Sequence, residues 1–226
     1  MGKLLTIVVL CMVSMGVRAQ NDVTKFLGIP IDGTKEMMIQ KLKAKGYQYN
    51  SVLECLEGEF NGRSVHLYIV TNNNKVWRIA VEEIVASSEG DIKIRFNDLC
   101  QQFYNNQKYM SASLSNYFLT DEEDISYEML INNKRYQAAF YQLPEVVDSI
   151  AISEEVRAVL LSKYTEEQLA GPTEEMKMEM ISSAVVGMLE KYSKKSVWFM
   201  ISERYGRYKI LLYYDNEYNH SNGEDL

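Results

Sequence analysis

The sequence has 226 residues, of which 46% are apolar and 24% are charged, and it contains only 3 prolines. This composition excludes collagen-like, disordered and disulfide-dense chains, and it predicts a folded protein of one large or two small domains. The formal charge is -7. A chain with this negative charge is a poor match for the phosphate backbone, so we expect no nucleic-acid partner.

The first nineteen residues predict a secretory signal peptide. Lys3 supplies the positive start, residues 4–13 form an apolar run, and Val17-Arg18-Ala19 has the small residues of a cleavage site. The apolar run is shorter than the roughly 20 residues that span a membrane. We therefore expect an exported protein, periplasmic or extracellular, cleaved after Ala19 and without a transmembrane segment.

The segment after this leader predicts a short helix followed by three strands. Thr34 is the expected N-cap of the helix, and Met38 and Leu42 fall on one of its faces. The pair Asn61-Gly62 separates two strand-like runs, which is the strongest short-range signal for a tight hairpin. The expected strands cover residues 52–60, 63–71 and 76–85.

The period then changes to that of a helix beginning at Asp91, with core positions at Ile92, Phe96, Leu99, Cys100 and Phe103. Further on, two strands over 125–131 and 135–143 are expected to flank a turn at Asn132-Asn133. Helix starts are expected at Ser153 and Thr173, and a short helical turn between them at Thr165. A final hairpin is predicted over 197–203 and 207–215.

This order of elements predicts an α+β fold, mainly an antiparallel sheet with helices packed on one face. The turns Asn61-Gly62-Arg63 and Tyr205-Gly206-Arg207 each precede an apolar strand. One interpretation is two diverged helix-plus-meander repeats, and the other is a chance similarity between hairpins. The first interpretation divides the chain into a signal peptide (1–19), a first half (20–111) and a second half (112–226). The second is compatible with one continuous domain.

The stretch from Leu27 to Met37 resembles the lead-in and first helix of beta-lactamase-inhibitor-protein-like and outer-membrane-assembly-lipoprotein-like modules. The whole chain also resembles exported proteins of gut Bacteroidales. The first resemblance implies helices packed on a small antiparallel sheet whose surface binds other proteins. The chain departs from the lipoprotein pattern because Leu10, rather than a small residue, precedes Cys11.

The predicted hairpin register places Glu57 opposite His66, and it places Cys55 and Tyr68 on the same face as this pair. Cys55, His66 and Glu57 could form a thiol nucleophile with its base, or a metal site. The ordinary alternative, which we favour, is a solvated sheet face with a favourable Glu–His pair. No nucleophile elbow, zinc-type spacing or phosphate loop occurs, so we expect no metal and no cofactor.

Two further groups of residues leave alternatives open. The acidic run 121–124 could bind a cation but lacks the spacing of a calcium loop, which favours a solvated connector. In an oxidising compartment Cys55 and Cys100 could form one disulfide, although the patterns place them in different layers.

All 16 tyrosines follow the leader, and several lie in predicted strands. Because a tyrosine tolerates water while offering a large apolar ring, it suits contact with a protein or a glycan, although strands favour aromatic residues in any case. The candidate binding residues are Tyr68, Tyr136, Tyr208, Tyr213 and Tyr214. The sequence thus favours an exported non-catalytic binding module, with a cell-envelope enzyme or an assembly subunit of unknown oligomeric state as alternatives.

Overall fold

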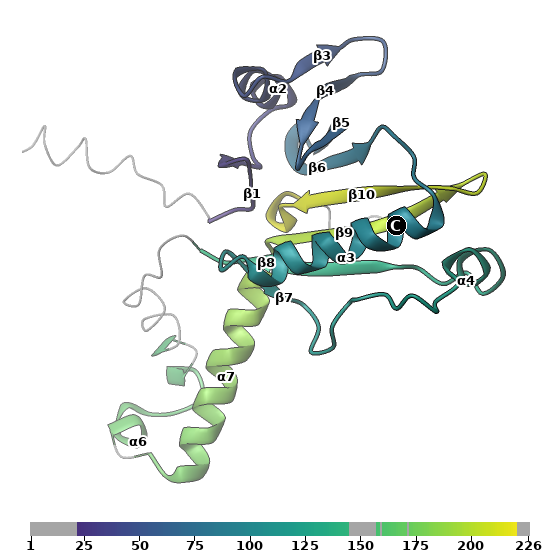
Figure 1. Ribbon diagram of the computed structural model, residues 1–226. Coiled ribbons are helices and arrows are strands. Elements are labelled where there is room, and N and C mark those ends of the chain that lie inside the picture. Colours follow the sequence, from purple (N-terminus) through teal and green to yellow (C-terminus); the bar gives the residue numbers. More distant parts are fainter. Residues whose placement is uncertain (1–21, 145–156, 159, 171, 221–226) are drawn as a thin grey trace, which may run out of the picture.

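The computed structural model describes residues 22–144, 157–158, 160–170 and 172–220 (Figure 1). The expected signal peptide and the expected helix start at Ser153 lie outside these residues. The described part is an α+β structure built on an eight-stranded antiparallel sheet, which confirms the predicted fold class. A separate two-stranded hairpin, β1 (Lys25–Phe26) and β2 (Ile29–Pro30), precedes the first helix.

The large sheet has the strand order β3-β4-β5-β6-β10-β9-β8-β7. Its strands are β3 (Gln48–Asn50), β4 (Cys55–Phe60), β5 (Arg63–Asn72), β6 (Lys75–Glu83), β7 (Tyr109–Ser111), β8 (Gln137–Gln142), β9 (Ser196–Arg204) and β10 (Arg207–Asp215). The helices are α2 (Lys35–Ala44), α3 (Glu89–Asn105), α4 (Ile125–Ile131), α6 (Glu166–Ala170) and α7 (Glu174–Ser193), and a 3-10 turn, η2 (Glu217–Asn219), follows β10.

The first hairpin has the register that the sequence predicts. Asn61 and Gly62 adopt φ angles of 50° and 70°, the left-handed values that a two-residue hairpin turn needs and that Asn-Gly supplies. Leu56 therefore pairs with Leu67, and Glu57 pairs with His66. Side chains of opposite character are sorted onto the two faces of β4 and β5, as the alternation of a strand requires.

One face of the sheet is covered by α2 and α3 and contains the core. A row of inward side chains crosses the sheet, and helix residues at core spacing pack on it. Burial of such side chains contributes about 1.5–3 kcal/mol each. The row is Leu67, Val81, Leu212, Phe199 and Ala138, and the helix residues are Met38, Leu42, Ile92, Phe96, Leu99, Cys100 and Phe103.

The expected strand over 125–131 is wrong, because this segment forms α4. Asp124 caps the helix by accepting a hydrogen bond from the amide of Tyr127 at 2.8 Å. Ile125 is buried in the core, and Met129, four residues later, packs against the same core. The residues that reach the core therefore have the spacing of a helix. Asn133, with φ 51°, follows the C-cap of this helix and forms no hairpin turn.

The division predicted at residues 111 and 112 falls between β7 and β8, which pair directly along one continuous sheet. The strand order is instead symmetric about the β6–β10 seam. On one side α2 precedes β3 to β6, and on the other α3 precedes β7 to β10, with α4, α6 and α7 inserted between strands. The origin of this arrangement in a duplication stays a prediction.

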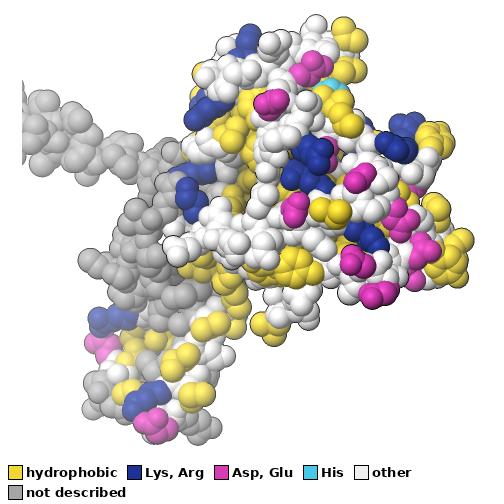
Figure 2. All heavy atoms as spheres, in the orientation of Figure 1, with side chains coloured by type: hydrophobic (Ala, Val, Ile, Leu, Met, Phe, Trp, Pro, Cys, Tyr) yellow, Lys and Arg dark blue, Asp and Glu magenta, His cyan; other side chains and the backbone are white. Residues whose placement is uncertain are grey.

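Helix α7 extends away from the sheet (Figure 1). Its start was expected at Thr173, whose hydroxyl accepts a hydrogen bond from the amide of Met176 at 3.3 Å. Figure 2 shows hydrophobic side chains along its surface. The exposed large apolar residues of α7 are Met178, Ile181, Val185, Val186 and Leu189, at 44–68%. Within the described residues, no helix has the length and apolar character needed to cross a membrane.

Candidate functional site

The face of the sheet opposite α2 and α3 bears a row of aromatic side chains that we call the aromatic row. Tyr68 pairs with Ala80, Ala80 with Tyr213, and Tyr213 with Trp198, so these residues cross four adjacent strands. The three aromatic residues are half-buried. The rings of Tyr213 and Trp198 stack with their centroids 4.2 Å apart, while the small Ala80 leaves space between the two tyrosines.

Arg78 and Asp215 hold one edge of the aromatic row in place. The guanidinium of Arg78 donates from Nε and Nη2 to the two carboxylate oxygens of Asp215, at 2.6 and 2.7 Å. The indole Nε1 of Trp198 donates to the same carboxylate at 2.8 Å. The guanidinium also lies 4.8 Å from the ring centroid of Tyr213, a favourable cation–π distance. These contacts fix the rotamers of the row.

Trp77 lies next to this network because the β5–β6 ladder shifts register between Val70 and Thr71. The extra residue in β6 brings Trp77 beside Arg78, whose guanidinium is 4.2 Å from the indole centroid. The ring of His220 packs against the Trp77 indole, with the two ring centroids 4.3 Å apart. The sequence alone gave no indication of this irregularity, because no glycine or proline marks the bulge.

Three of the five predicted binding tyrosines lie in the core and cannot contact a partner. Tyr136, Tyr208 and Tyr214 are 4%, 2% and 6% exposed. The hydroxyl of Tyr136 donates to Glu123 at 2.6 Å, and burial raises the pKa of Tyr214 well above its ordinary value. Large strand aromatics at inward positions serve as core filler, and only Tyr68 and Tyr213 remain candidates for recognition.

The three residues Cys55, Glu57 and His66, which we call the thiol cluster, come together as the register predicts. Their ligand atoms all lie within 4.8 Å of one another, and His66 Nε2 is 3.7 Å from Glu57 Oε1. Cys55 is 0% exposed, whereas 18% of the His66 side chain and 42% of the Glu57 side chain are exposed. The disulfide that the sequence left open as the less favoured alternative is not formed: both Cys55 and Cys100 are free, and Cys100 packs in the core from the buried face of α3.

The electrostatics of the thiol cluster disfavour a thiolate nucleophile. Burial raises the pKa of Cys55, and the carboxylates of Glu57 and Glu82 raise it further. A cysteine nucleophile needs the opposite influence, a positive environment that lowers its pKa. This face therefore brings together the residues that the enzyme alternative requires, but it lacks the positive charge that would activate the Cys55 thiol.

The predicted acidic run is used in the fold. Glu123 accepts from Tyr136 and pairs with Lys134, contacts that lower the pKa of its carboxyl. Asp124 caps α4. The run is thus more than a solvated connector. Glu123 and Asp124 bind other groups of the protein, and neither contact requires a cation.

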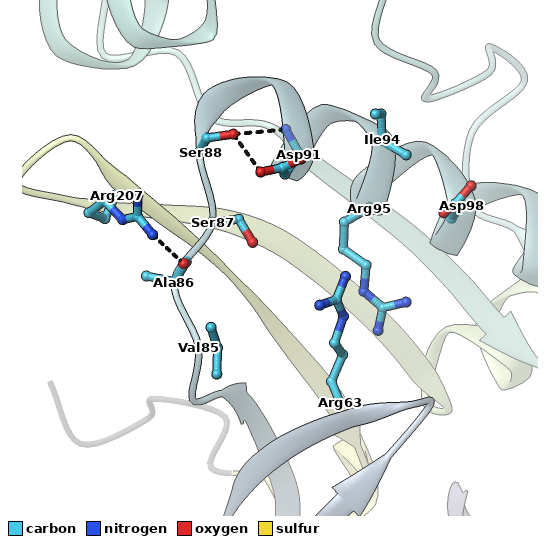
Figure 3. Close-up of a pocket in the computed structure, with 10 residues that line it drawn as sticks. All are labelled: Arg63, Val85, Ala86, Ser87, Ser88, Asp91, Ile94, Arg95, Asp98 and Arg207. Atoms are coloured by element: carbon cyan, nitrogen blue, oxygen red, sulfur yellow. Dashed lines mark hydrogen bonds between the residues drawn. The ribbon is translucent and has the colours of Figure 1, made fainter.

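A cavity of about 400 Å³ lies at the N-terminal end of α3 (Figure 3). Arg63, Arg95 and Arg207 contribute to its lining, but Arg95 is paired with buried Glu83 at 2.8 Å and Arg207 donates to the carbonyl of Ala86 at 2.7 Å. Sequence reasoning missed this arginine group because its members are far apart in the chain. The Arg95 contact joins α3 to the end of β6, and the Arg207 contact holds the loop between these two elements.

Comparison with protein-family models, with curated proteins and with solved structures finds no match to this chain.

Proposed function

We propose that this protein is an exported, non-catalytic binding module that holds a protein partner against the aromatic row. The observation that supports this proposal most directly is the set of half-buried residues that face away from the helices. Tyr68, Arg78, Trp198, Met200 and Tyr213 belong to the residue types enriched in protein interfaces. A sheet face of this kind presents them together without any rearrangement of the backbone.

Preorganisation adds to the argument. The Arg78–Asp215 pair, the Trp198 hydrogen bond and the Tyr213 stack hold these side chains in one conformation before a partner arrives. Binding then costs less rotamer entropy than it would for mobile side chains, by about 0.5–1.5 kcal/mol for each side chain already held. Glu57 lies in the neighbouring row of the same face, and Glu82 in that row is paired with Lys209.

The test is site-specific photo-crosslinking in the producing cells, with the reactive residue at position 213 or, as control, at Ile94, which is 64% exposed on α3. We expect a discrete protein adduct from position 213 that is absent from position 94. The additional substitution Leu211→Lys, in the row beside Tyr213, should remove it. Equal adducts from both positions would contradict the proposal, and retention of a glycan that requires Tyr213 would replace the protein by a glycan.

A second candidate, an assembly subunit, is favoured by α7. Met178, Ile181 and Val185 follow one another at spacings of three and four residues, and all are exposed. This spacing matches the seam along which two helices pack. We infer that this seam packs against α7 of a second copy of the chain. Measurement of self-association tests this inference.

The enzyme alternative has weaker support. It needs Cys55 to be reactive in the folded protein, so rapid alkylation of the native chain at this residue would favour it. Slow alkylation is the result that the buried thiol and its raised pKa lead us to expect.

A further inference from the structure

The thiol cluster has the donor set of a metal site. Cys55 and Glu57 are two residues apart on β4 and therefore share a face, and His66 lies directly opposite Glu57 on β5. A thiolate, an imidazole and a carboxylate are the three protein donors that zinc uses. We propose that Cys55, Glu57 and His66 bind one Zn²⁺ ion on the side of the β4–β5 hairpin that faces away from α2 and α3.

The distances fit this ion after a small closure. Two donors at zinc bond lengths of about 2.0–2.3 Å in tetrahedral geometry lie roughly 3.3–3.7 Å apart. The observed separation of His66 Nε2 from Glu57 Oε1 is 3.7 Å, and all three donors lie within 4.8 Å of one another. Rotation of the Glu57 and His66 side chains, which are partly exposed, can supply the remaining movement while the strands stay paired.

A neighbouring side chain already orients one of the proposed ligands, and another lies close to the cluster. Asn50 donates from Nδ2 to Glu57 Oε1 at 2.8 Å and so restrains the orientation of this carboxylate. Glu82 lies opposite His66 on β6, where it accepts from Lys209 at 3.0 Å and from Tyr68 at 3.3 Å. Such outer contacts typically change metal affinity by about 10–100-fold when removed.

The charges balance when the ion is bound. A thiolate and the Glu57 carboxylate together neutralise Zn²⁺, a neutral imidazole adds no charge, and Glu82 is already neutralised by Lys209. Zinc with three protein donors keeps a fourth position for water. A bound cation would thus account for a thiol and a carboxylate that share one side of the hairpin.

The site was hidden from sequence motifs because its donors lie on two strands. Zinc motifs are recognised by two cysteines or histidines at short spacing, and this chain has a single donor of each kind here. Only the pairing of β4 with β5 brings the three together. This inference is independent of the proposed protein partner, since the ion needs no residue of the aromatic row.

The experiment is calorimetric titration of the reduced full chain with Zn²⁺, together with Co²⁺ as a spectroscopic probe. We expect one ion per chain and a thiolate-to-cobalt charge-transfer band. Cys55→Ser, His66→Gln and Glu57→Gln should each weaken binding at least tenfold, and Cys55→Ser should also abolish the band. The chain supplies matched controls in Cys100→Ala and His220→Gln, which should change neither result.

If a variant fails to fold, the effect of zinc on the wild-type protein still tests the proposal. Zn²⁺ should slow alkylation of Cys55 in the wild-type chain and raise the midpoint temperature at which that chain unfolds. Absence of binding, binding that survives Cys55→Ser, or equal losses in Cys100→Ala and His220→Gln would each overturn the site. Photo-crosslinking at position 213 is read without added zinc, so the two proposals fail separately.

Discussion

Arg78 and Asp215 form a two-pronged ion pair across the seam between β6 and β10, joining residues 137 positions apart in the chain. The side chain of Asp215 is 2% exposed and that of Arg78 is 22% exposed. The pair therefore lies where the two groups of strands meet, and it also positions Trp198 and Tyr213. Stability and the shape of the proposed binding surface depend on the same contact.

Removal of one partner from this pair should be costly. Asp215→Ala leaves a partly buried guanidinium without its partner and frees the Trp198 indole donor, so we expect the free energy of unfolding to fall by about 3–5 kcal/mol. Denaturant titration measures this loss. The control is Glu174→Ala, whose exposed pair with Lys177 should contribute about 0.5 kcal/mol or less. Similar small effects from both variants would contradict the structural role.

Gly58 should not tolerate a side chain. A Cβ at this position would lie 2.6 Å from Cδ1 of Tyr47, whose ring covers the glycine and whose hydroxyl donates to the carbonyl of Glu59 at 2.9 Å. Gly58→Ala should therefore destabilise the protein by about 1–3 kcal/mol through overpacking.

The matched change is Gly90→Ala in the first turn of α3, where a Cβ meets nothing within 4 Å. This variant should be neutral or stabilised by up to about 1 kcal/mol, because alanine is the better helix former. Thermal unfolding of the two variants, followed by circular dichroism, distinguishes them. A stable Gly58→Ala protein would show that Tyr47 moves aside at little cost.

The free energy of unfolding should fall at alkaline pH because the buried Cys100 thiol ionises less readily in the folded chain than in the unfolded chain. Burial raises the pKa of its thiol from 9.0 to about 12, so above pH 9 the unfolded chain loses a proton that the folded chain retains. The contribution is fully present below pH 9 and is lost as pH rises toward about 12, since stability falls with pH wherever the folded state binds more protons. Cys100→Ala should show a shallower decline over this interval in denaturant titrations. Identical slopes would contradict this assignment.

Helix α7 should mediate self-association if the assembly interpretation holds. Ile181, 60% exposed, belongs to the apolar seam, and a charge there would be buried at the interface. We expect sedimentation equilibrium to show a dimer whose population falls on dilution, and Ile181→Asp to be monomeric. Ser182→Asp places the same charge on an adjacent exposed position and should leave the dimer intact. A monomeric wild-type chain at all concentrations would remove this candidate.

The sequence by itself determined the local elements whose signals are short-range. Asn61-Gly62 requires left-handed φ angles at two successive residues, and that requirement set the register that pairs Glu57 with His66. The helix expected from Asp91 followed in the same way from its apolar stripe, and in the structure it begins two residues earlier, at Glu89 after the N-cap Ser88. Thus the thiol cluster could be predicted before any coordinates existed, because its members lie on one hairpin.

Only the tertiary structure decided what was distant or ambiguous. The apolar pattern of residues 125–131 fits both a strand and a helix, and the contact of Ile125 and Met129 with the core selected the helix. The pairing of β6 with β10 placed Arg78 beside Asp215 and Tyr68 in line with Tyr213. Packing of the core buried Tyr208 and Tyr214. Alternation tells which side chains share a face, but packing of the whole chain determines which face stays in contact with water.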